Sequence, residues 1–170
     1  MLRDLCHRLV GDLGENSSIV SLSFDKGSSR VFVLLGDGTV LHLSEIDDFL
    51  RFEGKFNACV DQEIDNGWFY LRFIAGTGSA VAISHSGSIV SIEASDVGTL
   101  EPEQIGCIDG GIASASWSPD QSFLTIITNN NTMLCMSSTW DVLQEIPMAP
   151  RLSGSTVGKQ LNFSVLVSSK

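Results

Sequence analysis

The sequence predicts an all-β fold, an incomplete β-propeller of about three four-stranded blades. Three observations predict this fold: windows of the chain align without a gap, each window contains three strand-like runs, and outer strand-like segments can follow them. Four-stranded antiparallel units that recur about every 40 to 50 residues are typical of propeller blades.

The repeat is visible when windows of 24 residues that begin at Ser21, Tyr70 and Ser114 are aligned, with 49 and 44 residues between successive starts. The windows read SLSFDKGSSRVFVLLGDGTVLHLS, YLRFIAGTGSAVAISHSGSIVSIE and SASWSPDQSFLTIITNNNTMLCMS. At shared places they carry an aromatic residue, a turn residue, a Ser or Thr, and an apolar residue. In that order these are Phe24, Phe73 and Trp117; Gly38, Gly87 and Asn131; Thr39, Ser88 and Thr132; and Val40, Ile89 and Met133.

The first window shows how each repeat divides into strands. Between its second and third strands, Gly36-Asp37-Gly38 suits a tight hairpin, because Asp and Gly tolerate positive φ. Ser86-Gly87 and Asn129 to Asn131 take that place in the other windows, and Asn is the best substitute for Gly there. Apolar or alternating runs predict the strands of this window at Ile19 to Phe24, Arg30 to Leu35 and Thr39 to Ser44.

A fourth, outer strand can follow a window, for example at Gln104 to Ile108 and at Val142 to Ile146. Helix-compatible patterns occur only at Leu2 to Leu13 and at Ile46 to Phe52. The competing architecture is a β-sandwich with regularly spaced strands. The ungapped register favours the propeller, because unrelated sandwich strands have no reason to share hairpin length and turn position.

The expected organisation has three parts. Residues 1–16 form an N-terminal lead segment, residues 17–148 form the blades, and residues 149–170 form a linker with a strand-like stub. The blades divide approximately into 17–62, 63–109 and 110–148. Since propellers close with about four to eight blades, we expect either a piece of a longer protein or completion by another chain.

Charge is unevenly distributed along the chain. The net charge is -10, and no Lys or Arg lies between Phe73 and Pro150. Nucleic acids and anionic membranes are bound largely through Lys and Arg, so the sequence predicts no direct nucleic-acid binding and no membrane binding by this segment. The N-terminus shows no secretory signal, which predicts a protein that stays inside the cell.

No catalytic, cofactor-binding or metal-binding residue is predicted, and no cofactor. Cys6, Cys59, Cys107 and Cys135 lie far apart, which predicts buried free thiols. His42 and His85 fall inside the windows, where hydrogen-bonded histidines are more common than catalytic ones. Glu45, Asp47 and Asp48 read as a solvated loop, although an acidic stretch could also hold a cation. Gly154 to Gln160 lacks the spacing of a phosphate-binding loop.

Three short motifs bear on the fold. Ser23-Phe24-Asp25-Lys26-Gly27 resembles the core of the Asp-box turn of sialidase-type propellers, which is a structural turn. Ser118-Pro119-Asp120-Gln121 lies where WD40 repeats turn between their first two strands, and Pro suits the second position of a type I turn. In a WD40 blade the Trp-Asp dipeptide closes the third strand, and that place is near Met136-Ser137 in this alignment. Trp140-Asp141 lies beyond it. The sequence therefore predicts degenerate, WD40-like blades.

Residues 110–121, GGIASASWSPDQ, together with the following TIITNNNTMLCMSSTWDVLQEIPM, resemble the amino-terminal propeller of the largest subunit of the Elongator complex, the IkappaB kinase complex-associated protein family. Thr139, Leu143 and Glu145 match that family's acidic strand end approximately, and AVAISHSGSIVSIEA resembles its preceding blade. The resemblance covers roughly residues 17–148 and is strongest over 110–148.

The resemblance implies a non-catalytic scaffold fragment that supports wobble-uridine modification of transfer RNA through protein contacts, while another subunit performs the chemistry. It implies other Elongator subunits and the rest of its own propeller as partners, and a cytoplasmic location with the nucleus as a second compartment. Two alternatives stay open. One is another intracellular WD40-type interaction scaffold, and the other is a propeller glycosidase, which would need paired carboxylates or a tyrosine nucleophile such as Tyr70.

Overall fold

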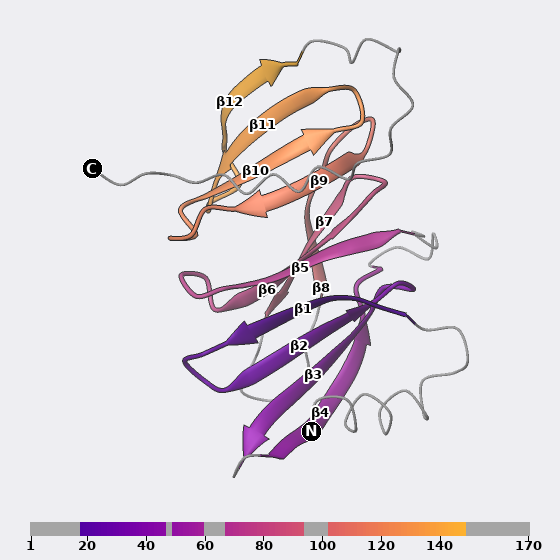
Figure 1. The fold of residues 1–170 in the computed structure, drawn as a ribbon, viewed down its shortest axis with the longest axis vertical. Coiled ribbons are helices and arrows are strands. Elements are labelled where there is room, and N and C mark those ends of the chain that lie inside the picture. Colours follow the sequence, from indigo (N-terminus) through magenta and orange to yellow (C-terminus); the bar gives the residue numbers. More distant parts are fainter. Residues whose placement is uncertain (1–17, 47–48, 60–66, 94–101, 149–170) are drawn as a thin grey trace, which may run out of the picture.

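The computed structural model describes residues 18–46, 49–59, 67–93 and 102–148. These residues form twelve strands in three four-stranded antiparallel sheets, and each sheet follows chain order. The sheets are stacked one after another along the molecule, as propeller blades are (Figure 1). The predicted all-β fold of three blades is confirmed, and the predicted lead segment and the linker with its stub lie outside the described residues.

The strand bounds agree closely with the predicted ones. Blade 1 comprises β1 (Ile19–Asp25), β2 (Arg30–Leu35), β3 (Thr39–Ile46) and β4 (Phe49–Asn57). Blade 2 comprises β5 (Trp68–Ile74), β6 (Ser79–Ser84), β7 (Ser88–Glu93) and β8 (Pro102–Cys107). Blade 3 comprises β9 (Ile112–Trp117), β10 (Phe123–Thr128), β11 (Thr132–Ser137) and β12 (Val142–Pro147). The outer strands predicted near Gln104 and Val142 are therefore present as β8 and β12.

The three blades share one register. The aromatic residues of the repeat pair with the second strand seven positions later in every blade, as Phe24 with Val31, Phe73 with Ala80 and Trp117 with Leu124. The first strand also shifts register at the same place in each blade, at Ile19, Trp68 and Ile112. The aligned sequence positions are thus equivalent positions in space.

The turn between the second and third strands is also the same in each blade. Gly38, Gly87 and Asn131 all have positive φ, which is the reason for Gly or Asn at this place. Each donates its N–H to the carbonyl three residues earlier, and each accepts a hydrogen bond from the residue that follows the fourth strand. Those donors are Ala58 at 2.9 Å, Ile108 at 3.0 Å and Met148 at 2.7 Å.

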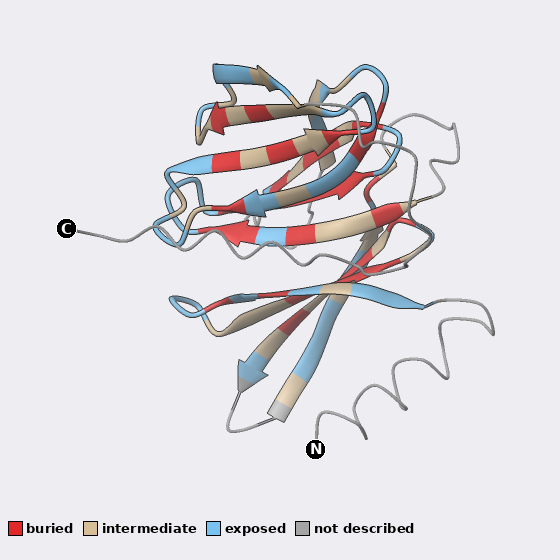
Figure 2. Ribbon diagram, turned by 45° about the horizontal axis from the view of Figure 1, so that its top comes forward, coloured by how far each residue is buried: buried red, intermediate tan, exposed pale blue. Residues whose placement is uncertain are grey.

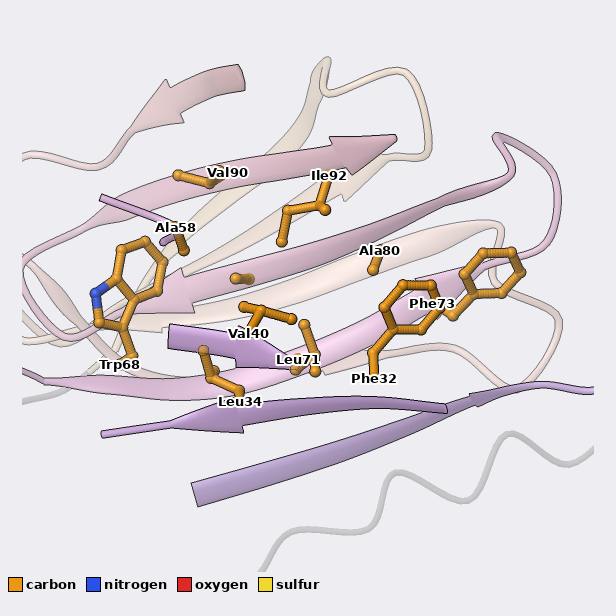
Figure 3. Close-up of a cluster of buried hydrophobic side chains, with 11 residues drawn as sticks. Phe32, Leu34, Val40, Ala58, Trp68, Leu71, Phe73, Ala80, Val90 and Ile92 are labelled. Atoms are coloured by element: carbon orange, nitrogen blue, oxygen red, sulfur yellow. The ribbon is translucent and has the colours of Figure 1, made fainter. Parts of the chain in front are cut away.

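The core lies between the blades. Phe32, Leu34 and Val40 of blade 1 pack against Leu71 and Phe73 of blade 2 (Figure 3). On its other face, blade 2 packs against blade 3 through a second cluster that includes Ile83 and Trp117. Blade 2 is covered on both faces, so every residue of β6 is buried, which explains its uninterrupted small and apolar sequence (Figure 2).

Two predictions about local features are wrong. In the helix-compatible run at Ile46 to Phe52, Ile46 ends β3 and Phe49 begins β4, because these residues pair across the sheet, as Leu43 does with Phe52. Cys107 is exposed, since it ends an outer strand, and Cys59 and Cys135 are only half-buried. All three cysteines are free thiols as expected, and Cys6 lies outside the described residues.

Candidate interaction surface

Because the three blades share one register, their corresponding turns lie on the same side of the stack, and the stack therefore has two ends. The end formed by the β2–β3, β6–β7 and β10–β11 turns is called the β2–β3 end. The end formed by the β1–β2, β5–β6 and β9–β10 turns, together with the β11–β12 turn, is called the β1–β2 end. Binding residues of scaffold folds are found mostly on such connections, so each end is considered in turn.

His85 is the most distinctive side chain at the β2–β3 end. Its ring stacks on Phe69 with a centroid distance of 4.1 Å, and its Nδ1–H donates to the carbonyl oxygen of Ile112 at 2.8 Å. The Ile112 N–H in turn donates to the His85 carbonyl oxygen at 3.0 Å. This reciprocal pair joins blade 2 to blade 3, so His85 acts as a link between blades.

His42 and Tyr70 are the other titratable side chains singled out from the sequence. His42 stacks on Phe32 at 5.1 Å, and its Nε2 is buried and has no hydrogen-bond partner among the described residues. Burial lowers the pKa of His42 below 6.5. Burial raises the pKa of the Tyr70 hydroxyl, which forms a hydrogen bond with the backbone of Trp117. His42 lies in blade 1, whereas His85 and Tyr70 lie in blade 2, and each contacts its own set of neighbours.

The Asp-box-like turn lies at the β1–β2 end of blade 1. Asp25 accepts hydrogen bonds from the Gly27 N–H at 2.9 Å, from the Ser28 hydroxyl, and from Arg30, which also forms an ion pair with it at 3.2 Å. Burial alone would raise the pKa of Asp25, but these hydrogen bonds outweigh it and hold the pKa below 3.8. The guanidinium of Arg30 lies over the ring of Phe73 in blade 2 at 5.9 Å. The motif thus closes a turn and contacts the next blade.

The Ser118 to Gln121 turn lies at the same end of blade 3. It is closed by a hydrogen bond from the Gln121 N–H to the Ser118 carbonyl at 2.9 Å, with Pro119 at its second position, as predicted. Asp120 accepts hydrogen bonds from the hydroxyls of Ser118 at 2.6 Å and Ser122 at 2.8 Å, which lower its pKa. The turn presents an exposed carboxylate at the β1–β2 end.

The Gln121 side chain is an interblade contact that the sequence did not predict. It donates to the Phe73 carbonyl oxygen at 2.9 Å and accepts from the Ala75 N–H at 2.9 Å. It therefore caps the end of β5 from the neighbouring blade. A polar residue in a turn gives no sequence signal for such a contact, because its partners lie 46 to 48 residues away.

Trp140 and Asp141 lie in the turn between β11 and β12, outside the third strand, as the register predicted. Trp140 contacts the ring of Trp117 edge to face at 5.9 Å. Asp141 accepts a hydrogen bond from the Thr139 hydroxyl at 2.8 Å and is exposed. With Asp120 it makes the β1–β2 end of blade 3 acidic, and residues 110–148 contain no Lys or Arg.

Within the described ranges, no group of three or more His, Cys, Asp or Glu side chains is arranged to hold a metal ion. The same residues include no helix with the length and apolar character needed to cross a membrane. Asp47, Asp48 and the segment from Gly154 to Gln160 lie outside the described residues.

The sequence comparison agrees with this arrangement of blades. The family model described as "ELP1 first N-terminal beta-propeller" matches residues 6–163. The chain belongs to the ELP1 first-propeller family. Elongator complex protein 1 of Schizosaccharomyces pombe is 26% identical over 147 residues, which cover 79% of this chain and 11% of that protein. Its counterpart in Saccharomyces cerevisiae is 26% identical over 130 residues, which cover 72% of this chain and 9% of that protein. The ELP1-family chain thus spans about a tenth of these relatives.

Solved structures with the same fold have unrelated functions. A putative 6-phosphogluconolactonase from Bacteroides uniformis superposes with a TM-score of 0.60 at 16% identity, over 78% of this ELP1-family chain and 41% of the enzyme. The dihydro-heme d1 dehydrogenase NirN superposes with a TM-score of 0.59 at 14% identity, over 79% of this chain and 28% of NirN. At these identities the likeness shows the propeller fold alone.

Proposed function

We propose that the chain is a non-catalytic scaffold segment of an Elongator-type complex, which holds other subunits through protein contacts. The family match over residues 6–163 is the observation that carries the proposal. Two relatives named Elongator complex protein 1 support membership of such a complex. Through that complex the segment supports wobble-uridine modification of transfer RNA in the cytoplasm, with the nucleus as a second compartment.

The structure supports a scaffold role in two ways. The blades are joined by hydrogen bonds and stacked rings as well as by apolar packing, which makes the ends of the stack rigid platforms for binding. Turn residues such as Asp120, Asp141 and Asn130 are exposed at these ends. Rigid scaffolds that present exposed turns are well suited to protein recognition.

The charge distribution favours protein partners over nucleic acid. Blade 3 carries Asp120, Asp141 and Glu145 and no Lys or Arg, so it repels the phosphate backbone. An acidic surface attracts basic protein segments. We therefore assign the β1–β2 end of blade 3 to contacts with a partner that presents Lys and Arg.

Co-purification of the full chain with the other Elongator subunits from cells tests the proposal. We expect recovery of those subunits by the wild-type chain and by Gln104→Lys, which changes an exposed residue on β8 of blade 2. The double variant Asp120→Lys/Asp141→Lys is expected to recover at least about tenfold less, with an unchanged thermal unfolding midpoint. Failure of the wild-type chain to recover any of them would overturn the proposal.

Two further measurements separate the alternatives. Recovery of a different set of partners would assign the chain to another propeller scaffold, and hydrolysis in a glycosidase screen would assign it to an enzyme. Binding of labelled transfer RNA to the isolated chain at physiological salt is expected to be undetectable. Tight binding there would contradict the role assigned to the acidic blade.

A further inference from the structure

The sequence contains two Asp-Gly dipeptides, Asp37-Gly38 and Asp109-Gly110. Such a dipeptide can rearrange without an enzyme, because the glycine nitrogen can attack the aspartate side chain and Gly has no Cβ to hinder the attack. The rearrangement requires that both the nitrogen and the carboxyl group are free to approach each other. The two dipeptides lie in turns that differ in this respect.

At Asp37-Gly38 both reacting groups are held by hydrogen bonds. The Gly38 N–H donates to the Leu35 carbonyl oxygen at 3.0 Å, and the Asp37 Oδ1 accepts from the Thr39 N–H at 2.9 Å. Gly38 is also buried. Attack of this nitrogen on this carboxyl group therefore requires that both hydrogen bonds break first.

At Asp109-Gly110 both reacting groups are free. The two residues are the central ones of a turn that is closed by a hydrogen bond from the Gly111 N–H to the Ile108 carbonyl oxygen at 3.1 Å. Gly110 has a φ of 81°, as the third residue of a type II turn has. Both Asp109 and Gly110 are exposed. Neither the Gly110 N–H nor the Asp109 carboxylate has a hydrogen-bond partner in the part of the chain that the structure describes.

This turn connects blade 2 to blade 3, and its flanking residues are anchored to both. The Ile108 N–H donates to the Gly87 carbonyl oxygen at 3.0 Å, and the Gly111 carbonyl oxygen accepts from the Asn129 N–H at 3.2 Å. The peptide unit between Asp109 and Gly110 is thus an exposed, unpaired group between two anchored ones.

We propose that Asp109 is a site of isoaspartate formation in the folded chain, whereas Asp37 is protected by its turn. In the first step the Gly110 nitrogen forms a bond to the Asp109 Cγ. The nitrogen loses its proton and the carboxyl group loses its hydroxyl, so one water leaves and a five-membered succinimide ring remains.

In the second step water opens the ring at either carbonyl group. Opening at the side-chain carbonyl restores Asp109, and opening at the backbone carbonyl leaves the chain running through the former side chain. The product has the same composition as the starting chain, and no oxidant or cofactor takes part. Its free carboxylate is a substrate for a methyltransferase that transfers a methyl group from S-adenosylmethionine to isoaspartate, which gives a methyl ester and S-adenosylhomocysteine. The proposal does not depend on the scaffold role proposed above.

Ageing of the purified 170-residue chain for several weeks at neutral pH tests the proposal. Samples are then unfolded and digested with an endoproteinase that cleaves before aspartate but not before isoaspartate, and mass spectrometry gives the uncleaved fraction at each site. We expect this fraction to rise at least about tenfold faster at Asp109 than at Asp37, because the protected site must first lose two hydrogen bonds. Equal rates at the two sites in the folded chain would overturn the proposal.

The same chain aged in urea is the matched control. Unfolding removes both turns, so the two Asp-Gly dipeptides should then react at similar rates. A difference that persists in urea would show that the fold is not its cause, and would overturn the protection assigned to the Asp37 turn.

Methyl transfer provides an independent measurement. The aged chain is incubated with an isoaspartyl methyltransferase and S-adenosylmethionine, and the bound methyl groups are counted. Asp109→Glu should lower this count, because glutamate would have to form a less favourable six-membered ring, and Asp37→Glu should leave it unchanged. Asn66-Gly67 can also give isoaspartate, with loss of ammonia, but every variant retains it, so the difference between variants reports on Asp109. Equal counts for the wild-type and Asp109→Glu chains would contradict the assignment of the site.

Discussion

The hydroxyl of Ser23 on β1 accepts a hydrogen bond of 2.7 Å from the backbone N–H of Phe73 on β5, fifty residues later in the chain. The serine is buried, so its hydroxyl satisfies an amide that would otherwise lose its hydrogen bond to water. A side chain of one blade thus completes the backbone hydrogen bonding of the next, and the same residues define how the blades are stacked.

Ser23→Ala is therefore expected to lower the free energy of unfolding by about 1 to 3 kcal/mol, because it leaves the Phe73 N–H buried and unpaired. The matched control is Ser138→Ala, since the described structure shows no hydrogen bond of the Ser138 hydroxyl, and this change should be nearly neutral. Urea denaturation of both variants measures the difference. Equal stabilities would contradict a contribution of the interblade hydrogen bond.

The equivalent aromatic residues Phe73 and Phe24 should differ in their contribution to stability. Phe73 lies between blades and stacks on Phe32 at 5.7 Å, so Phe73→Ala should cost about 3 to 5 kcal/mol. Phe24 is 46% exposed, and Phe24→Ala should cost about 1 kcal/mol or less. Thermal unfolding of the two variants checks this. A similar loss for both would mean that the blades do not stack as described.

Gly87 cannot be replaced without strain. It has a φ of 115°, and a Cβ there would lie 2.2 Å from the Ile108 carbonyl oxygen. Gly87→Ala should therefore destabilise the chain by at least about 2 kcal/mol. Gly76→Ala serves as the control, because a Cβ at Gly76 meets nothing within 4 Å. That control should be neutral or slightly stabilising in the same denaturation experiment, and an equally harmful Gly76→Ala would argue against the turn geometry.

The stability of the chain should fall in mild acid because of His42. Burial lowers the folded-state pKa of His42 below 6.5, so the unfolded chain takes up a proton that the folded chain does not. This contribution is fully present above pH 6.5 and is lost as the pH falls from 6.5 towards the folded pKa. His42→Phe keeps the stacking on Phe32 and should flatten the pH dependence of unfolding in that window. An unchanged slope would show that His42 is not responsible.

The sequence predicted what local signals encode. The strands of each repeat and their shared turns follow from apolar runs and from Gly or Asn at positive φ, so these elements were placed to within about two residues. The Asp25 and Ser118 turns could also be predicted, because their hydrogen bonds join residues close in sequence. The link to the largest Elongator subunit came from the motif over residues 110–148 and agrees with the family match.

Features that depend on distant residues could not be predicted. The run at Ile46 to Phe52 has apolar residues at helical spacing, yet Phe49 to Phe52 pair with β3 and are extended. The interblade contacts of Ser23, Gln121 and His85 join residues 27 to 50 positions apart, and nothing in a single repeat encodes them. The exposure of Cys107 likewise depends on its place in an outer strand of the sheet.

The central claim is that repeats of the sequence are equivalent blades stacked in chain order. Nuclear Overhauser effects from the Phe73 amide proton to the β-protons of Ser23 test it most directly, because these groups meet only if blade 2 stacks on blade 1 in the described register. We predict a strong cross-peak, accompanied by one between the His85 ring and Ile112. Their absence from spectra that show the cross-strand contacts within each sheet would contradict the stacked arrangement.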